Sequence, residues 1–348
     1  MKRVAAIDCG TNSIRLLVAD ADPRTGELKE LDRRMQIVRL GQGVDRTGRL
    51  APEALERTFA ACREYAAVIK GLGAEQVRFV ATSASRDAEN REDFVRGVVD
   101  ILGVQPEVIT GDQEAEFSFT GATKELTAIG AAGAERLPGE GGGGRRVGLP
   151  QPYLVVDIGG GSTEFVLGDG SVRAARSVDI GCVRMTERHL VHQGEAHPSP
   201  DHRPATSASH TSLTDPPAPA QIAAMKADIA AALDRAEEAV PLGEAATLVG
   251  LAGSVTTVAG IALGLAHYDS AAIHHSRIPL AKVREITEHL LTSTHAERAA
   301  SPVIHPGRVD VIAAGALVLL SVMERSGARE VVVSEHDILD GIAWSIAG

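Results

Sequence analysis

The sequence predicts an α/β fold of two domains that face a common cleft. Its 348 residues exceed the roughly 250 to 300 at which a single hydrophobic core stops growing, so two domains are expected. Strand and helix patterns alternate along the chain, which is typical of α/β proteins. An apolar run that ends in an aspartate and a turn of small residues occurs twice, at residues 4–13 and 153–162. This repetition predicts two related domains.

The first half is predicted to begin with a β-hairpin. Residues 4–8 read as a buried strand and residues 14–19 as its returning partner, because both runs are apolar and flank a polar turn. A third strand is expected near residues 35–40. These three strands form one side of the first predicted sheet.

Helices and strands alternate after this hairpin. Pro52 opens an amphipathic helix that extends to about residue 70, where glycines end it. A strand at 77–81, a helix at 91–102 and a strand at 107–109 then complete a domain with a mixed sheet. Asp112 is predicted to cap the next helix, since acidic residues suit the first turn of a helix. This helix leads toward the second domain.

The second half repeats the pattern. Strands at residues 153–157 and 165–167 form its hairpin, and a helix at 220–240 precedes a buried strand at 247–251. That strand ends in a glycine turn that begins another helix. The remaining predicted elements are a helix at 308–325, a strand at 330–334 and a closing helix at 337–347.

We place the first domain at residues 1–124 and the second at residues 125–348, leaving open whether the last helix packs back on the first domain. Two segments are predicted to be flexible insertions without chemistry. Residues 136–150 are rich in glycine, and residues 191–219 are rich in proline, serine, threonine and histidine. The irregular spacing of the histidines favours a solvated loop over a metal site.

Composition excludes several classes of function. The net charge of −11 argues against general nucleic-acid binding, which usually requires a basic surface. No apolar stretch reads as a signal peptide or a membrane span, so a cytoplasmic protein without a membrane partner is expected. Cys9, Cys62 and Cys182 are widely separated in apolar contexts, which suits buried thiols rather than disulfides or a zinc site.

The tips of both hairpins are predicted to bind phosphate. Glycines leave backbone N–H groups uncovered, so successive amides can converge on an anion, and nearby hydroxyls add donors. The carboxylates of Asp8 and Asp157 then lie beside the phosphates, where Mg²⁺ can bridge like charges. Either turn alone is also consistent with a simple tight turn, but the duplication favours the phosphate site. The predicted phosphate-binding residues of the tips are Gly10, Thr11, Asn12, Ser13, Gly159, Gly160, Gly161, Ser162 and Thr163.

Further groups are expected at the same cleft. Arg86 follows the end of the strand at 77–81, where α/β sheets place groups that contact ligands, and Arg15 lies in the first hairpin. Gly253 and Ser254 follow the strand at 247–251, where the free amides of a helix N-terminus favour phosphate. Taken alone, this third turn is ambiguous.

Together the motifs resemble a known family. The duplicated hairpins resemble those of the superfamily of sugar and acetate kinases, heat-shock chaperones and actin. Residues 8–13 (DCGTNS), 111–115 (GDQEA), 157–164 (DIGGGSTE), 181–184 (GCVR) and 252–254 (AGS) resemble, in this order, the exopolyphosphatase and guanosine pentaphosphate phosphohydrolase family. The resemblance implies two actin-like, ribonuclease H-like domains with mixed five-stranded sheets that face a central cleft.

The resemblance also implies a chemistry. Family members are Mg²⁺-dependent hydrolases that remove terminal phosphate from linear polyphosphate or from pppGpp. Glu114 matches the acid that activates or orients the attacking water, while Asp157 and Glu164 match metal-side carboxylates that act with Asp8. Glu116 is two residues from Glu114 on the predicted helix, so only one of them can face the cleft. Phosphoryl transfer needs little more than an in-line water and donors for the phosphoryl oxygens.

Three functions stay open. The first is an exopolyphosphatase that prefers short polyphosphate, because the chain lacks the C-terminal helical domains of longer members and offers only 3 % aromatic residues to hold a guanine. The second is a pppGpp phosphohydrolase, or both activities together. The third is a non-catalytic sensor of polyphosphate or of guanosine penta- or tetraphosphate, against which the intact acidic residues argue. Mn²⁺ in place of Mg²⁺ and a homodimer are compatible with each.

Overall fold

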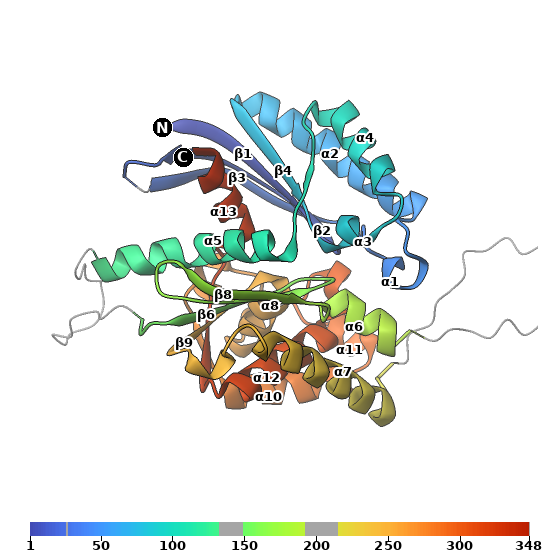
Figure 1. Ribbon diagram of the computed structural model, residues 1–348. Helices are drawn as coiled ribbons and strands as arrows, with labels where there is room; N and C mark the ends of the chain where they lie inside the picture. The colour runs from blue at the N-terminus through green and yellow to red at the C-terminus, as the bar shows by residue number, and fades with distance from the viewer. Residues whose placement is uncertain (26, 132–148, 192–214, 348) are drawn as a thin grey trace, which may run out of the picture.

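The computed structural model describes residues 1–25, 27–131, 149–191 and 215–347. The predicted insertions at residues 136–150 and 191–219 therefore lie mostly outside the described residues. The chain forms two α/β halves, one above the other in Figure 1, each built on its own sheet. The predicted α/β class with two mixed sheets is confirmed.

The first sheet has five strands in the order β3-β2-β1-β4-β5. β1 (Lys2–Cys9), β2 (Ser13–Asp22) and β3 (Glu27–Ile37) are antiparallel neighbours, whereas β4 (Gln76–Ala81) and β5 (Glu107–Val108) run parallel to β1. The third strand was predicted at residues 35–40, which is wrong. Its true course is half exposed and rich in charge, as is common for edge strands, so apolar periodicity does not reveal it.

Helices cover both faces of this sheet. α2 (Pro52–Leu72) and α4 (Arg91–Leu102) pack on one face through a core that includes Tyr65, Phe79 and Phe94. α13 (Ile338–Ala347), the last helix of the chain, packs on the other face, where Ile342 joins Val4. The C-terminal helix therefore covers the N-terminal sheet (Figure 1).

The second sheet has six strands in the order β10-β11-β9-β6-β7-β8, one more than predicted. Two of these strands, β8 and β10, were not predicted individually. Both lie at the edges of the sheet: β8 is exposed or half-buried along most of its length, and β10 has only three residues, too few to show an alternating pattern. The bounds of the six are β6 (Tyr153–Ile158), β7 (Thr163–Gly168), β8 (Val172–Val178), β9 (Thr247–Leu251), β10 (Arg277–Pro279) and β11 (Glu330–Val333).

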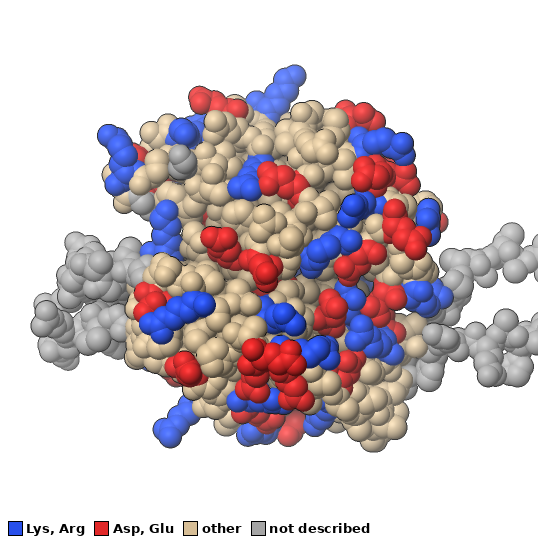
Figure 2. Space-filling model, viewed as in Figure 1, with Lys and Arg blue, Asp and Glu red and all other residues tan. Residues whose placement is uncertain are grey.

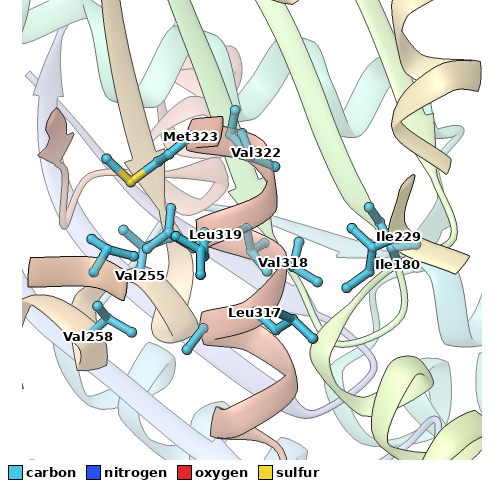
Figure 3. Close-up of a cluster of buried hydrophobic side chains, with 14 of the residues drawn as sticks. Ile180, Ile229, Val255, Val258, Leu317, Val318, Leu319, Val322 and Met323 are labelled. Atoms are coloured by element: carbon cyan, nitrogen blue, oxygen red, sulfur yellow. The ribbon is translucent and has the colours of Figure 1, made fainter. Parts of the chain in front are cut away.

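The core of the second half surrounds α12 (Ile312–Ser326), whose side chains are buried along most of its length. Figure 3 shows Leu317, Val318 and Leu319 of this helix pointing toward different neighbours. The helix begins later than the predicted residue 308, because residues 306–308 form a short 3₁₀ turn. The other long helices here are α7 (Pro219–Glu237), α8 (Ala252–Ala262) and α10 (Leu280–Thr292), with α6 (Cys182–His189), α9 (Ser270–Ile273) and α11 (His295–Ala299) shorter.

α5 (Gly111–Ala131) connects the two halves. Ala115 and Phe119 pack against the second sheet, while the helix crosses α13 on the side of the first. A methyl group on Gly121 would come within 1.8 Å of the Asp337 carbonyl oxygen, so the two helices touch through backbone at this point. The short α1 (Val44–Thr47) and α3 (Ser83–Asp87) complete the first half.

The surface agrees with the acidic composition. On the face in Figure 2, arginine and lysine side chains alternate with acidic ones instead of gathering into one basic patch. Among the described helices, none combines the length and the apolar character that a membrane span requires.

Candidate functional site

The two hairpin turns meet face to face. A methyl group on Gly160 would come within 3.1 Å of the backbone nitrogen of Asn12, so the second turn packs directly against the first. Between them lies a cavity of about 60 Å³, with room for about four water molecules, closer to the scale of one phosphoryl group than of a chain. Predicted phosphate-binding residues on its wall are Gly10, Thr11, Asn12, Ser13, Arg15, Gly159, Gly160, Ser162 and Gly253.

Four acidic side chains are buried around this cavity. Asp8 and Asp157 are each the second-last residue of their strand, β1 and β6. Glu164 is directly opposite Asp157 in the β6–β7 hairpin, and Glu114 lies in the first turn of α5. All four are 8 % exposed or less. The fold therefore brings every predicted acid to one place.

Burial and mutual repulsion raise the pKa values of these acids. Burial, then the neighbouring Asp157, raises the pKa of Glu164 to about 8. Burial and Asp337 raise the pKa of Asp157 to about 6. Glu114 has a pKa well above its ordinary value, because burial and Glu164 outweigh the nearby Arg86. The cluster therefore binds protons more tightly than isolated carboxylates do, and a bound cation would oppose this effect.

Hydroxyls and a guanidinium orient the carboxylates. Ser118 Oγ donates to Asp157 Oδ2 at 2.7 Å, and Ser177 Oγ donates to Glu164 Oε1 at 2.7 Å. Arg15 Nη2 donates to Asp8 Oδ2 at 2.7 Å. The other oxygen, Asp8 Oδ1, is buried without a hydrogen-bond partner among the described residues.

The unpaired Asp8 Oδ1 bears on whether the predicted Mg²⁺ fits this site. In the described part of the chain, no three His, Cys, Asp or Glu side chains are grouped so as to hold a metal by themselves. Mg²⁺ typically takes one or two carboxylates, several waters and substrate phosphates, and does not need a full protein cage. Asp8 Oδ1 beside the Asp157 carboxylate fits this donor set. Glu164 lies off the cavity wall, so its predicted role as a ligand stays a prediction.

Glu114 owes its position to the start of α5. The cap is Thr110 and not the predicted Asp112: Gln113 N donates to Thr110 Oγ1 at 3.3 Å, and Thr110 N donates to Gln113 Oε1 at 3.0 Å. Asp112 lies within the first turn because the helix begins two residues earlier than predicted. As expected from their spacing, Glu114 is buried against the cleft while Glu116 is exposed.

The two predicted arginines are occupied by carboxylates. Arg15 bridges Asp8 and Asp337, so its donors orient Asp8. Arg86, on α3, donates to Glu114 Oε2 at 3.3 Å and to the Ile109 carbonyl at 2.9 Å. Direct binding of phosphate by either arginine stays a prediction.

Three other predicted ligands do not line the cavity. Thr163 donates its hydroxyl to the Ile180 carbonyl at 3.2 Å. The Ser254 side chain packs against Gly315, because a methyl group added to Gly315 would lie 2.3 Å from Ser254 Oγ. Gly161 faces Ser83 and Thr11 on the outer side of the turn. Their predicted contact with phosphate therefore stays a prediction.

Arg308 is a cleft residue that the sequence analysis missed. It lines the cavity and lies over Gly253, on which a methyl group would come within 2.0 Å of the guanidinium carbon. Its guanidinium has no hydrogen bond or ion pair with any residue that the structure describes, and burial lowers its pKa. The only local signal is its place in a Pro-Gly-Arg turn before an apolar helix. An unpaired cation in a cleft of amide donors is suited to bind an anion.

The chain matches the family model described as the Ppx/GppA phosphatase family over residues 17–132, 147–198 and 208–347. It is 46 % identical to exopolyphosphatase 2 of Mycobacterium tuberculosis, with 100 % of this chain and 99 % of the relative covered. A crystal structure of an exopolyphosphatase-like protein is 40 % identical and superposes with a TM-score of 0.83, covering 99 % of this chain and 97 % of its own. The PPX-GPPA enzyme of Aquifex aeolicus is 28 % identical with a TM-score of 0.73, and 99 % of each chain is covered.

Proposed function

Because the chain belongs to the Ppx/GppA phosphatase family and is a hydrolase of the exopolyphosphatase type, we propose that it releases terminal orthophosphate from short linear polyphosphate with Mg²⁺. One observation carries the proposal. The two glycine-rich turns face each other across buried carboxylates. Asp8 Oδ1 and both polar atoms of the Asn12 side-chain amide are buried there without a hydrogen-bond partner among the described residues. Unsatisfied buried groups of this kind are costly unless a ligand completes them.

The terminal phosphoryl group is placed between the two turns. The backbone amide of Gly160 and the hydroxyls of Ser13 and Ser162 donate to its oxygens, where developing charge is stabilised most. The amide of Gly10 instead donates to the Ser13 carbonyl at 2.9 Å and closes the first turn. Arg308 contributes the free cation of the site. Asp8 and Asp157 would hold Mg²⁺, which supplies charge neutralisation between adjacent phosphates.

Glu114 acts on the attacking water. Its carboxylate lies on the wall of the same cavity, and its raised pKa makes it a stronger base than an exposed glutamate. Arg86 holds the carboxylate in place and opposes the rise in its pKa. The water loses its proton to Glu114 as it attacks phosphorus in line, and the shortened polyphosphate leaves.

A second candidate is hydrolysis of a guanosine 5′-polyphosphate such as pppGpp. A larger cavity of about 620 Å³ adjoins the first and shares Arg15, Gly253 and Arg308 with it. Its walls include Tyr268, Met35 and Ile304, so an apolar surface with one aromatic ring is available beside the phosphate site. The volume falls in the range of small-molecule sites, which favours this activity as the alternative.

One experiment separates the candidates. Orthophosphate release is measured from tripolyphosphate and from pppGpp, with Mg²⁺ or with a chelator, for the wild type and Tyr268→Ala. The proposal expects Mg²⁺-dependent release from tripolyphosphate that Tyr268→Ala leaves unchanged. Release from pppGpp alone, lost in Tyr268→Ala, would replace it with the second candidate. Tight binding of both substrates without release would identify a sensor.

A further inference from the structure

Ion pairs join the two halves at one end of the cleft. Figure 1 shows α1 and α3 of the first half lying next to α6 of the second. Arg184 of α6 reaches across to Asp45 of α1 at 2.8 Å and to Asp87 of α3 at 2.5 Å. Glu187, one turn later, accepts from the backbone nitrogen of Gly43 at 3.0 Å. The seam between these elements leaves a void of only about 10 Å³.

The same arginine holds the second phosphate-binding turn. Arg184 Nε donates to the Gly161 carbonyl at 2.8 Å, and its guanidinium side chain is 13 % exposed. The turn is also fixed by the start of α6, since Cys182 N donates to Gly159 O at 2.9 Å and Val183 N donates to Gly160 O at 2.9 Å. With its carbonyls so occupied, the turn presents its amides to the cleft.

Arg184 therefore contacts both halves of the molecule and the turn at once. Its bonds to Asp45 and Asp87 are made only when these aspartates lie against α6, with the two halves close together. If the halves separate, both aspartates withdraw, and the guanidinium keeps only the Gly161 carbonyl and Asp179, which lies 3.7 Å away in its own half. Arg188 forms a useful contrast, because it pairs with Asp45 and Asp228 but makes no contact with the turn.

We propose that Arg184 is a positioning residue that couples closure of the cleft to the conformation of the second phosphate-binding turn. The proposal rests on the function proposed above, since the turn matters only if it binds phosphate. Arg184 acts through the Gly161 peptide, and touches neither substrate nor the attacking water.

The test is amide hydrogen exchange of the full-length protein without substrate, read from peptides that cover residues 159–162. Asp87→Asn and Asp45→Asn/Asp87→Asn remove the partners across the seam while leaving Arg184 in place. Both aspartates are partly exposed, so these isosteric changes leave the core untouched. Arg184→Lys keeps the charge but cannot span three partners, and Arg188→Gln is the matched control.

Amide exchange of the turn is expected to be about tenfold faster in Asp45→Asn/Asp87→Asn, because this variant loses two partly exposed ion pairs. Arg184→Lys should give the same change and Arg188→Gln should leave the turn as in the wild type. The inference is overturned if α1 and α6 exchange faster while the turn does not, or if Arg188→Gln loosens the turn equally. Amide exchange is measured without turnover, so it can be read even from an inactive protein. An inactive protein would refute the proposed function without deciding whether Arg184 positions the turn.

Discussion

Replacing Arg308 with methionine separates ligand binding from folding. Methionine keeps most of the aliphatic stem and removes the guanidinium that lies over Gly253, and with it the charge. A hydrogen bond from a cation to an anionic oxygen contributes about 1.5 to 3 kcal/mol, so KM for tripolyphosphate should rise by about 10- to 150-fold. No hydrogen bond or ion pair with a described residue is lost, and burial already disfavours the charge, so the melting temperature should stay constant or rise.

Arg298→Met is the matched control. This arginine is 5 % exposed and donates to Asp215 Oδ1 at 2.9 Å and to the carbonyls of Val309 and Ser293. Its removal leaves those acceptors unpaired, which should cost about 3 kcal/mol or more and lower the melting temperature by several degrees. Phosphate release and differential scanning fluorimetry are measured for both variants. An unchanged KM in Arg308→Met, or a melting temperature that falls as far as in Arg298→Met, would refute the assignment of Arg308 to the ligand.

Three further changes have defined outcomes. Gly181→Ala places a methyl group 2.3 Å from the carbonyl carbon of Gly160, so it should destabilise the protein by about 1 to 3 kcal/mol and abolish activity. Gly243→Ala is the control: its added methyl group would have no atom within 4 Å, so the melting temperature and phosphate release should stay unchanged. Glu164 and Asp157 have raised pKa values of about 8 and about 6, so the folded state binds protons more tightly and the metal-free protein should lose stability as pH rises from about 4 to 8. Denaturant melts across that range should show this loss, and it should shrink in Glu164→Gln; a stability that rises with pH would show that the acids are not held as described. Ser118→Ala removes the donor to Asp157 and should weaken Mg²⁺ binding by about tenfold in calorimetry, and unchanged binding would mean that Asp157 is not oriented by this hydroxyl.

The hairpins were predictable because their signal is short in range. An apolar strand, an aspartate and a small-residue turn lie within about ten residues, and the β1–β2 and β6–β7 registers follow from that pattern. Helix geometry predicted that only one of Glu114 and Glu116 can face the cleft, and the family resemblance indicated Glu114. The edge strands were harder, because β3 is charged and β10 is three residues long.

Other features depend on tertiary packing, which the sequence does not display locally. The hydroxyls of Thr163 and Ser254 follow the phosphate motifs, yet packing against Ile180 and Gly315 turns them away from the cavity. Arg308 reaches the cleft from a turn more than 50 residues after Gly253. Side-chain direction and contacts between distant segments are set by the whole fold. Local sequence patterns therefore do not show that Thr163 and Ser254 point away from the cavity, or that Arg308 lines it.

We propose that Glu114 acts on the water that attacks a terminal phosphate. The most direct measurement is Mg²⁺-dependent release of orthophosphate from tripolyphosphate by the wild type, Glu114→Gln and Glu116→Gln. Loss of a general base should lower kcat of Glu114→Gln by about 10²- to 10⁴-fold with KM nearly unchanged, while the exposed Glu116→Gln stays at the wild-type rate. A Glu114→Gln variant that turns over as fast as the wild type would show that Glu114 is not the general base.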